Sequence, residues 1–438
     1  MRRVLNVALI LSIAGLVWFA PPARAQVPDS DAVRKEIAQL RKEFEEIRKQ
    51  YDARLAALEA RVAASASVAQ DSAAALNPPS AAPVPQGTEV QLPPPPSPPA
   101  GQGSAGSSKV FNPDISVIGN FLGAAGRSAG NPDPAKALEL HESEAALQAI
   151  VDPYARADFY LSFGEQGVNV EEGFITFPTI PGGLLVKVGK MRAAFGKVNG
   201  LHTHALPWAD RPLVTRNLVG GEDGINDAGI SVARLIPNPW LFLEATGQVF
   251  RGDSADVFQS NQRGDLTYLG RLRGYQDLSE STNLDIGASF STGHNSAGVF
   301  GGLDLGRFTT RLVGVDTTLR WKPLQRSIYH SFVARSEFVW SRREQPDGSQ
   351  SAFGYYVSGD YQLGRRLFAG GRLDRSAHAD AAGLIDTGQA LVLTYTPSEF
   401  SVIRAMYRRT LYARQIQASN EFLMQFQFAI GAHGAHPF

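Results

Sequence analysis

The last stretch of the chain, residues 420–438, alternates bulky apolar side chains with small or polar ones. The apolar positions are Phe422, Met424, Phe426, Phe428 and Ile430. Successive side chains of a β-strand point to opposite faces, so this spacing predicts a strand with one apolar face. A half-buried strand of a soluble β-sandwich would show the same spacing, and the choice between the two depends on the rest of the chain.

The same alternation recurs from residue 110 onward and predicts about sixteen strands. They are expected near 115–122, 143–150, 154–163, 168–177, 184–195, 229–235, 240–250, 266–275, 283–291, 311–321, 328–340, 353–363, 367–374, 390–395 and 401–408, with the closing strand last.

The connections between these strands alternate in length. Short connections carrying turn residues are expected at 152–153, 178–183, 237–239, 322–323 and 397–398. Long connections lie between them at 123–142, 196–228, 251–265, 292–310 and 375–389. A soluble sandwich has no reason to sort its loops in this way. Tight turns at one rim and long loops at the other are typical of an antiparallel outer-membrane β-barrel.

The two faces of the predicted strands support a barrel. Over residues 240–250, Leu241 and Leu243 share one face, while Glu244 and Gln248 share the other. Charged side chains are costly in a dry core, so the polar faces are expected to line a water-filled lumen. Aromatic residues near strand ends predict interfacial girdles: Tyr154, Trp240, Trp321, Tyr329, Tyr395 and Tyr407. A closed barrel also satisfies every backbone group in lipid.

The segment before the strands divides into three parts. Residues 1–25 resemble a cleaved signal peptide, with Arg2 and Arg3 before an apolar run that is shorter than the roughly 20 residues of a spanning helix. Residues 26–64 carry a heptad pattern that predicts a periplasmic coiled coil. Residues 65–109 are a proline-rich linker that lacks the apolar surface to fold, which leaves 110–438 for the barrel.

Composition excludes several function classes. Lys+Arg and Asp+Glu are both 42, so no basic excess favours nucleic acid. The chain has no cysteine, which excludes disulfides, thiolate metal sites and cysteine nucleophiles. Isolated Ser and His residues in the predicted strands do not establish a catalytic triad, and neither an enzyme nor a cofactor is predicted.

Two closely spaced histidines raise a metal hypothesis. His202 and His204 would point to one face of an extended segment, and imidazole is a common zinc ligand. No third ligand is evident from the sequence, so the favoured interpretation is a pair of solvated loop histidines without a metal. His433 and His436 receive the same interpretation.

The segment Lys187–Val232 resembles the phosphate-selective porin O/P family. The matching residues are Gly189-Lys190-Met191-Arg192, Phe195-Gly196, Asp210-Arg211 and Arg216, while Ala194 stands where the family usually has proline. The chain also looks like the porins of this group that carry an N-terminal coiled coil. The resemblance implies a sixteen-stranded, homotrimeric porin for small hydrophilic solutes, with anions such as phosphate among the candidates.

The resemblance also implies that the third long loop, 196–228, folds inward and narrows the pore. The candidate constriction residues on it are Lys197, His202, His204, Asp210, Arg211, Arg216, Glu222 and Asp223. A basic track on inward strand faces is expected from Arg271, Arg273, Arg320, Arg335, Arg372 and Arg404. The carboxylates that oppose it are Asp158, Glu244, Asp285, Asp316 and Glu337. These residues together predict a weak to moderate anion preference.

Two alternatives to a passive porin each account for part of the sequence. A TonB-dependent transporter would need a plug domain and about 22 strands, more than residues 110–438 supply. A tether between the outer membrane and the cell wall would use the coil and linker. The expected location is the outer membrane of a Gram-negative bacterium, in contact with its lipid. The terminal Phe438 resembles the signal read by the barrel-assembly machinery.

Overall fold

The computed structural model describes residues 113–431 apart from 166, 255–256, 260, 301–302, 305 and 414, together with Lys42 and Lys49, which are helical. The predicted signal peptide (1–25), coiled coil (26–64) and linker (65–109) otherwise lie outside the described residues, as do His433, His436 and Phe438. Among the residues described, no helix has the length and apolar character needed to cross a membrane.

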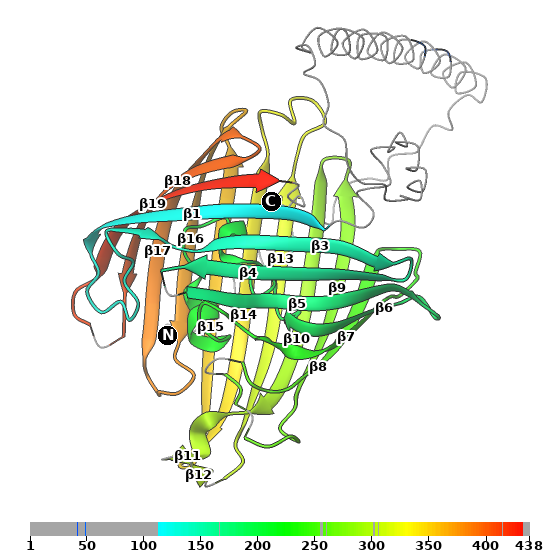
Figure 1. Ribbon diagram of the computed structural model, residues 1–438. Coiled ribbons are helices and arrows are strands. Elements are labelled where there is room, and N and C mark those ends of the chain that lie inside the picture. The colour runs from blue at the N-terminus through cyan, green and yellow to red at the C-terminus, as the bar shows by residue number, and fades with distance from the viewer. Residues whose placement is uncertain are drawn as a thin grey trace, which may run out of the picture. The chain divides into compact units, whose positions relative to one another are not determined.

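A single antiparallel sheet of 17 strands closes on itself where β1 pairs with β19 (Figure 1). The strands are β1 (Asp114–Arg127), β2 (Leu138–Leu140), β3 (Ser143–Asp152), β4 (Ala155–Gly164), β5 (Gly167–Ile180), β6 (Leu184–Arg192), β7 (Asn226–Leu235), β8 (Phe242–Phe250), β9 (Thr267–Ser279), β10 (Thr282–His294), β13 (Thr309–Trp321), β14 (Phe332–Gln345), β15 (Gly348–Gln362), β16 (Leu367–Ala377), β17 (Ile385–Ser398), β18 (Ser401–Leu411) and β19 (Ser419–Gly431). Because β2 and β3 follow one another along β1, they form one interrupted strand, and the barrel is sixteen-stranded.

Each of the sixteen predicted strands is present, so the barrel prediction is confirmed. Most strands run longer than predicted; β17, for example, covers Ile385–Ser398 where the pattern indicated only 390–395. Two strands are shorter than predicted: β6, which was expected to reach residue 195, ends at Arg192, and β8, which was expected to begin at residue 240, begins at Phe242. A small separate hairpin, β11 (Val299–Phe300) with β12 (Leu303–Asp304), lies in the connection 295–308.

The predicted sorting of connections by length holds with three exceptions. All five predicted short connections fall at one rim, and all five long ones at the other. However, 165–166 and 346–347 are tight turns at the long-loop rim, and 322–331 is an extended connection at the short-turn rim. The turn 346–347 is followed by Gly348, which has a φ of 140°, a backbone conformation that glycine adopts more readily than other residues. The sequence Asp347-Gly348 is typical of a tight β-hairpin turn.

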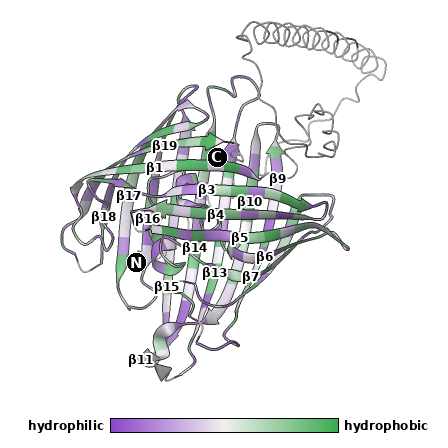
Figure 2. Ribbon diagram, in the orientation of Figure 1, coloured by the Kyte–Doolittle hydropathy of each residue, from purple (hydrophilic) through white to green (hydrophobic). Residues whose placement is uncertain are grey.

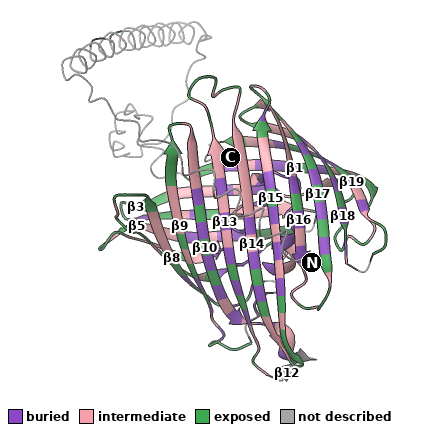
Figure 3. Ribbon diagram, turned by 180° about the vertical axis from the view of Figure 1, so that it is seen from behind, coloured by how far each residue is buried: buried purple, intermediate pink, exposed green. Residues whose placement is uncertain are grey.

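The outer surface of the barrel is apolar and the inner surface is polar. Along β19, Phe422, Met424 and Phe426 are exposed on the outside, while Glu421 and Gln425 are buried. The alternation is visible along many strands in hydropathy (Figure 2) and in burial (Figure 3). This is the arrangement of a barrel whose outside contacts hydrocarbon.

Aromatic residues mark the short-turn rim. Tyr154, Trp240 and Tyr329 are exposed in its connections, and Trp321 and Tyr395 lie at or near the ends of β13 and β17. Tyr407 lies on β18 toward the other rim. The predicted girdle is therefore present at the short-turn rim.

The apolar core of this fold lies inside the barrel. It joins residues of the connection 193–225 to inward-facing residues of the wall, which include Leu312, Val339, Tyr356, Met406 and Leu423. The polar inner faces predicted from the sequence are thus interrupted by apolar positions wherever this connection packs.

Candidate functional site

The third long loop leaves the wall after β6 and returns at β7, so it spans 193–225 rather than the predicted 196–228. Asn199 closes its base. The Asn199 amide donates to the carbonyl oxygens of Ala193 (2.8 Å) and Ile225 (3.0 Å), and the Ile225 N–H donates back to Asn199 Oδ1 (2.8 Å). Because both ends are held together, the whole loop projects into the barrel as a compact unit.

The loop enters the barrel at Gly196. This residue has a φ of 58°, and a side chain there would collide with the carboxylate of Glu337 on β14. Glu337 instead accepts the backbone N–H groups of Lys197 (3.4 Å) and Val198 (3.3 Å). The Lys197 ammonium donates to Asp285 on β10 at 2.9 Å, and burial of this loop residue lowers the pKa of Lys197.

The second half of the loop packs against β14 to β17. It contains the short helix α3 (Leu213–Leu218), whose residues Val214 and Leu218 are fully buried. Trp208 is 1% exposed and meets the ring of Tyr356 edge-on at 5.1 Å. The apolar packing gives the loop a fixed position on one side of the lumen.

An ion-pair network fastens this half of the loop. Asp210 accepts hydrogen bonds from Arg372 on β16 (2.8 Å) and Arg408 on β18 (2.6 Å). Burial alone would raise the pKa of Asp210, but the two guanidinium groups hold it below its ordinary value. The Arg372 guanidinium also lies 4.8 Å from the centre of the Trp208 ring, a cation–π contact.

Arg211 is fully buried inside the loop. Its guanidinium donates to the carbonyl oxygens of Val198 (3.2 Å) and Leu201 (2.7 Å), and burial lowers its pKa to about 10. Arg211 is therefore a loop residue whose charge is held within the loop by these carbonyl groups and not presented to the lumen. Arg216 lies 3.6 Å from Glu222, whose side chain is 44% exposed.

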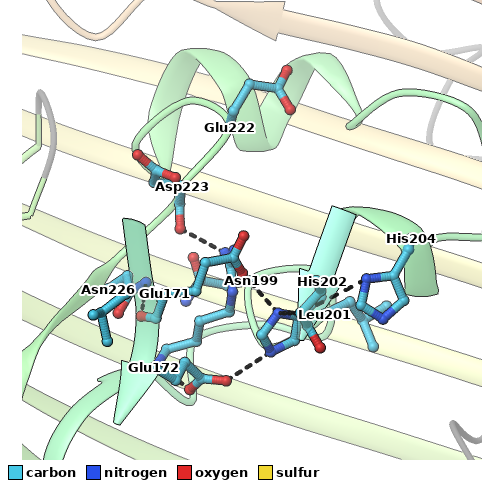
Figure 4. Close-up of polar contacts among 12 residues, drawn as sticks. Glu171, Glu172, Asn199, Leu201, His202, His204, Glu222, Asp223 and Asn226 are labelled. Carbon is cyan, nitrogen blue, oxygen red and sulfur yellow. Dashed lines mark hydrogen bonds and ion pairs between the residues drawn. The ribbon is translucent and has the colours of Figure 1, made fainter. Parts of the chain in front are cut away.

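The prediction of solvated histidines is wrong for His202 and His204, since both are buried. His202 lies among three glutamates, as Figure 4 shows in part. Its Nδ1 is 2.7 Å from both Glu171 Oε2 and Glu144 Oε2, and its Nε2 is 2.8 Å from Glu172 Oε2. Burial would lower the pKa of His202, but these carboxylates raise it well above its usual value.

Two of the three glutamates, Glu171 and Glu172, reach His202 through an irregularity in β5. Glu171 is an extra residue in the pairing of β5 with β4, because Tyr160 pairs with Glu172 and Leu161 with Val170. Such a β-bulge turns two successive side chains to the same side, here Glu171 and Glu172, and both are buried. Strict alternation assigns them to opposite faces, so the sequence pattern missed this cluster.

The six arginines of the predicted basic track lie on strands of the wall, and most of them are paired. Arg271 bonds Asp316, Arg273 bonds Asp285, Arg335 bonds Asp360, Arg372 bonds Asp374 and Asp210, and Arg404 bonds Gln425 and the Trp208 carbonyl. Arg320 is half-buried and makes no hydrogen bond or ion pair with any described residue. Of the carboxylates expected to oppose the track, Asp158 pairs instead with Arg156.

The exposed part of the loop lies at its return to the wall. Glu222 and Asp223 are both exposed, and the Asp223 carbonyl accepts a hydrogen bond from Arg192 at 2.7 Å (Figure 4). Lys197 is 26% exposed at the other end of the loop. The loop therefore presents both signs of charge to the lumen.

A closed sixteen-stranded barrel, apolar outside and charged inside, with its third loop folded inward, has the architecture of a porin. No family model matches the sequence. An uncharacterized protein of Aquifex aeolicus is 27% identical over 395 residues, covering 76% of this chain and 81% of that protein.

Three solved outer-membrane structures are similar in fold. The anion-selective porin of Comamonas acidovorans aligns with a TM-score of 0.51 and 11% identity, covering 72% of this chain and 98% of that one. OprB of Pseudomonas putida aligns at 0.50 with 10% identity, covering 74% and 95%. A loop-deletion mutant of OmpT, an outer membrane protein of Vibrio cholerae, aligns at 0.50 with 11% identity, covering 73% and 100%. At these identities the likeness shows a shared barrel fold.

Proposed function

We propose that this chain is an outer-membrane porin through which small hydrophilic solutes diffuse passively. The observation that carries the proposal is the third loop, which is fastened inside a closed barrel by Asn199, Glu337 and Asp210. Because these contacts fix its position, the loop narrows the lumen permanently and does not act as a moving gate. A sixteen-stranded barrel is also smaller than the 22-stranded barrels of plugged active transporters.

We further propose that the pore prefers anions, with phosphate as one candidate solute. Four cations, Lys197, Arg273, Arg320 and Arg335, lie close enough for their charges to interact. The neighbouring carboxylates are Asp285, Asp360, Glu244 and Asp316, of which Asp316 is paired with Arg271. Arg320 is the member of the group of four cations that has no bonded carboxylate among the described residues, and a narrow, low-dielectric passage focuses its charge. The resemblance to phosphate-selective porins supports the same sign.

Assembly and location complete the proposal. The resemblance supports a homotrimer in the outer membrane, with residues 26–64 as a parallel coiled coil in the periplasm and 65–109 as the linker to the barrel. The lipid-facing apolar surface supports the membrane location. The C-terminal segment up to Phe438 would present the closing strand to the barrel-assembly machinery.

Recording from planar lipid bilayers tests the proposed function. The detergent-folded protein should insert stepwise and conduct with a linear current–voltage relation, since diffusion needs no energy source. A trimer should close in three equal steps. Folded protein, verified by heat-modifiable migration on gels, that inserts without conducting would contradict a porin and leave the tether as the better explanation.

Replacing Arg320 by Gln should shift the zero-current potential in a KCl gradient toward cation preference. Of the predicted basic track, Arg320 is half-buried and has no bonded carboxylate among the described residues, so its removal takes away a positive charge that no neighbouring side chain pairs with. The shift should shrink at 1 M salt, where the Debye length is about 3 Å. Arg365→Gln, in the exposed turn 363–366, removes the same charge away from the lumen and should have a much smaller effect. Equal shifts in both variants would remove Arg320 from the selectivity filter.

A further inference from the structure

We propose that Glu144, Glu171 and His202 bind one divalent transition-metal ion of the Zn²⁺ class, which joins the third loop to the barrel wall. The three residues come from β3, β5 and the loop. Their ligand atoms all lie within 4.8 Å of one another, and all three side chains are buried. One imidazole nitrogen with two carboxylate oxygens is a donor set that zinc accepts readily in proteins.

The hydrogen bonding of this cluster is incomplete in a way that indicates a missing cation. His202 Nδ1 carries either one proton or one lone pair, so it bonds one oxygen at most, and that oxygen belongs to Glu171. Glu144 Oε2 lies equally close, at 2.7 Å, yet has no hydrogen-bond partner, and the Glu144 side chain is 2% exposed. A buried carboxylate oxygen without a donor is costly, and a metal ion would satisfy it.

The surrounding residues prepare His202 for this role. Its Nε2 is hydrogen-bonded to Glu172 at 2.8 Å. When Nε2 carries the proton of this bond, the lone pair of the neutral ring is on Nδ1, facing Glu144 and Glu171. A carboxylate behind a ligand histidine is the usual outer partner of protein zinc sites. The β-bulge turns the consecutive residues Glu171 and Glu172 toward His202, and bulges commonly redirect side chains at functional sites.

The distribution of charge also favours a cation in this cluster. The buried carboxyl groups of Glu144, Glu171 and Glu172 all lie within 2.8 Å of a ring nitrogen of His202. Among the described residues, Arg192 is the arginine that pairs with them, 3.1 Å from Glu171. Three carboxyl groups therefore face one guanidinium group, and a divalent cation would reduce this imbalance.

Metal content of the untagged, detergent-folded full-length protein tests this proposal. After incubation with ZnCl₂ and removal of unbound ion, we expect one zinc per chain by mass spectrometry. Co²⁺, used as a spectroscopic probe, should give a visible d–d absorption band that Zn²⁺ displaces. Glu144→Gln and His202→Gln should each abolish both signals. Glu172→Gln should weaken affinity about 10- to 100-fold, the usual effect of losing an outer partner.

Two controls separate this site from other histidines. His378→Gln alters a histidine that pairs with Asp386 outside the cluster, and the double variant His433→Ala, His436→Ala removes those near the C-terminus. Both should bind zinc as the unchanged protein does, and heat-modifiable migration verifies that each variant is folded. Absence of stoichiometric zinc in the unchanged protein would overturn the proposal. Zinc that persists in folded Glu144→Gln protein would overturn it equally, whether or not His202→Gln folds.

Discussion

Replacing Asp210 by Asn is expected to release the second half of the third loop from the wall. The change leaves Arg372 and Arg408, whose side chains are 2% and 6% exposed, without the carboxylate that they share. Breaking a buried ion pair costs about 3–5 kcal/mol where it leaves an unpaired charge. The cost here should be smaller, because Arg372 keeps Asp374 and Arg408 keeps Glu421. Bilayer recordings should show frequent partial closures, and the folded form should convert to the unfolded form on gels at a lower temperature.

The pH dependence of the same contact has a definite sign. The folded protein holds the pKa of Asp210 below its ordinary value. This carboxylate therefore stabilises the fold at every pH above its ordinary pKa. The contribution is lost as the pH falls through the lowered, folded-state pKa. Partial closures in the unchanged protein should therefore increase on strong acidification, and the Asn variant should lack this part of the response.

Asp253→Asn is the matched control for this prediction. Asp253 is exposed in the connection 251–266 and pairs with Arg251, so its loss should leave closures and heat stability nearly unchanged. If Asp210→Asn shows no additional partial closures and converts to the unfolded form at an unchanged temperature, the apolar packing of Trp208 and α3 alone holds the loop.

Replacing residues 197–222 with a short Gly-Ser linker should raise the single-channel conductance several-fold. The segment removed carries most of the loop that fills one side of the barrel, including Trp208 and α3. Some of the wall residues that it covers, such as Asp374 and Arg404, are charged and would be solvated by the enlarged lumen. Apolar wall residues such as Tyr356 and Met406 would be uncovered as well. The Asn199 closure is lost too, so the linker must hold Gly196 and Asp223 close together, and the retained residues connect it to β6 and β7.

A shortened 412–418 connection provides the control for the loop replacement. This connection lies at the same rim, and Ile416 within it is 99% exposed. Its shortening should leave conductance unchanged. A loop replacement that folds and conducts like the unchanged protein would show that residues 197–222 do not define the narrowest part of the pore.

The barrel was predictable because its physics is local and repetitive. The face that a strand residue occupies depends only on its position relative to its immediate neighbours. Phe422, Met424 and Phe426 accordingly face outward, as the pattern predicted. The boundaries were less accurate. Ala193 continues the apolar pattern of β6, but its N–H bonds Ile225 across the base of the loop, a partner distant in sequence.

The interior was predictable only in residue type. The sequence indicated that charges of both signs point inward, and the structure places them there. Which charges pair depends on register and on the loop, so the burial of Arg211 followed from carbonyl groups that no side-chain pattern reports. Glu171 and Glu172 were missed because a bulge breaks the alternation on which the prediction depends.

The inward position of the third loop has a consequence for the order of assembly. The loop follows β6, yet α3 packs on β14 to β17, which leave the ribosome much later. Until those strands arrive, the apolar residues Trp208, Val214 and Leu218 have no wall to cover them. Contacts between distant parts of a chain form slowly because the intervening segment must first be ordered. The folding chain therefore passes through a stage in which these apolar loop residues are exposed and the loop is open to proteolysis. Periplasmic chaperones would have to cover the loop until β1 pairs with β19 and the barrel closes.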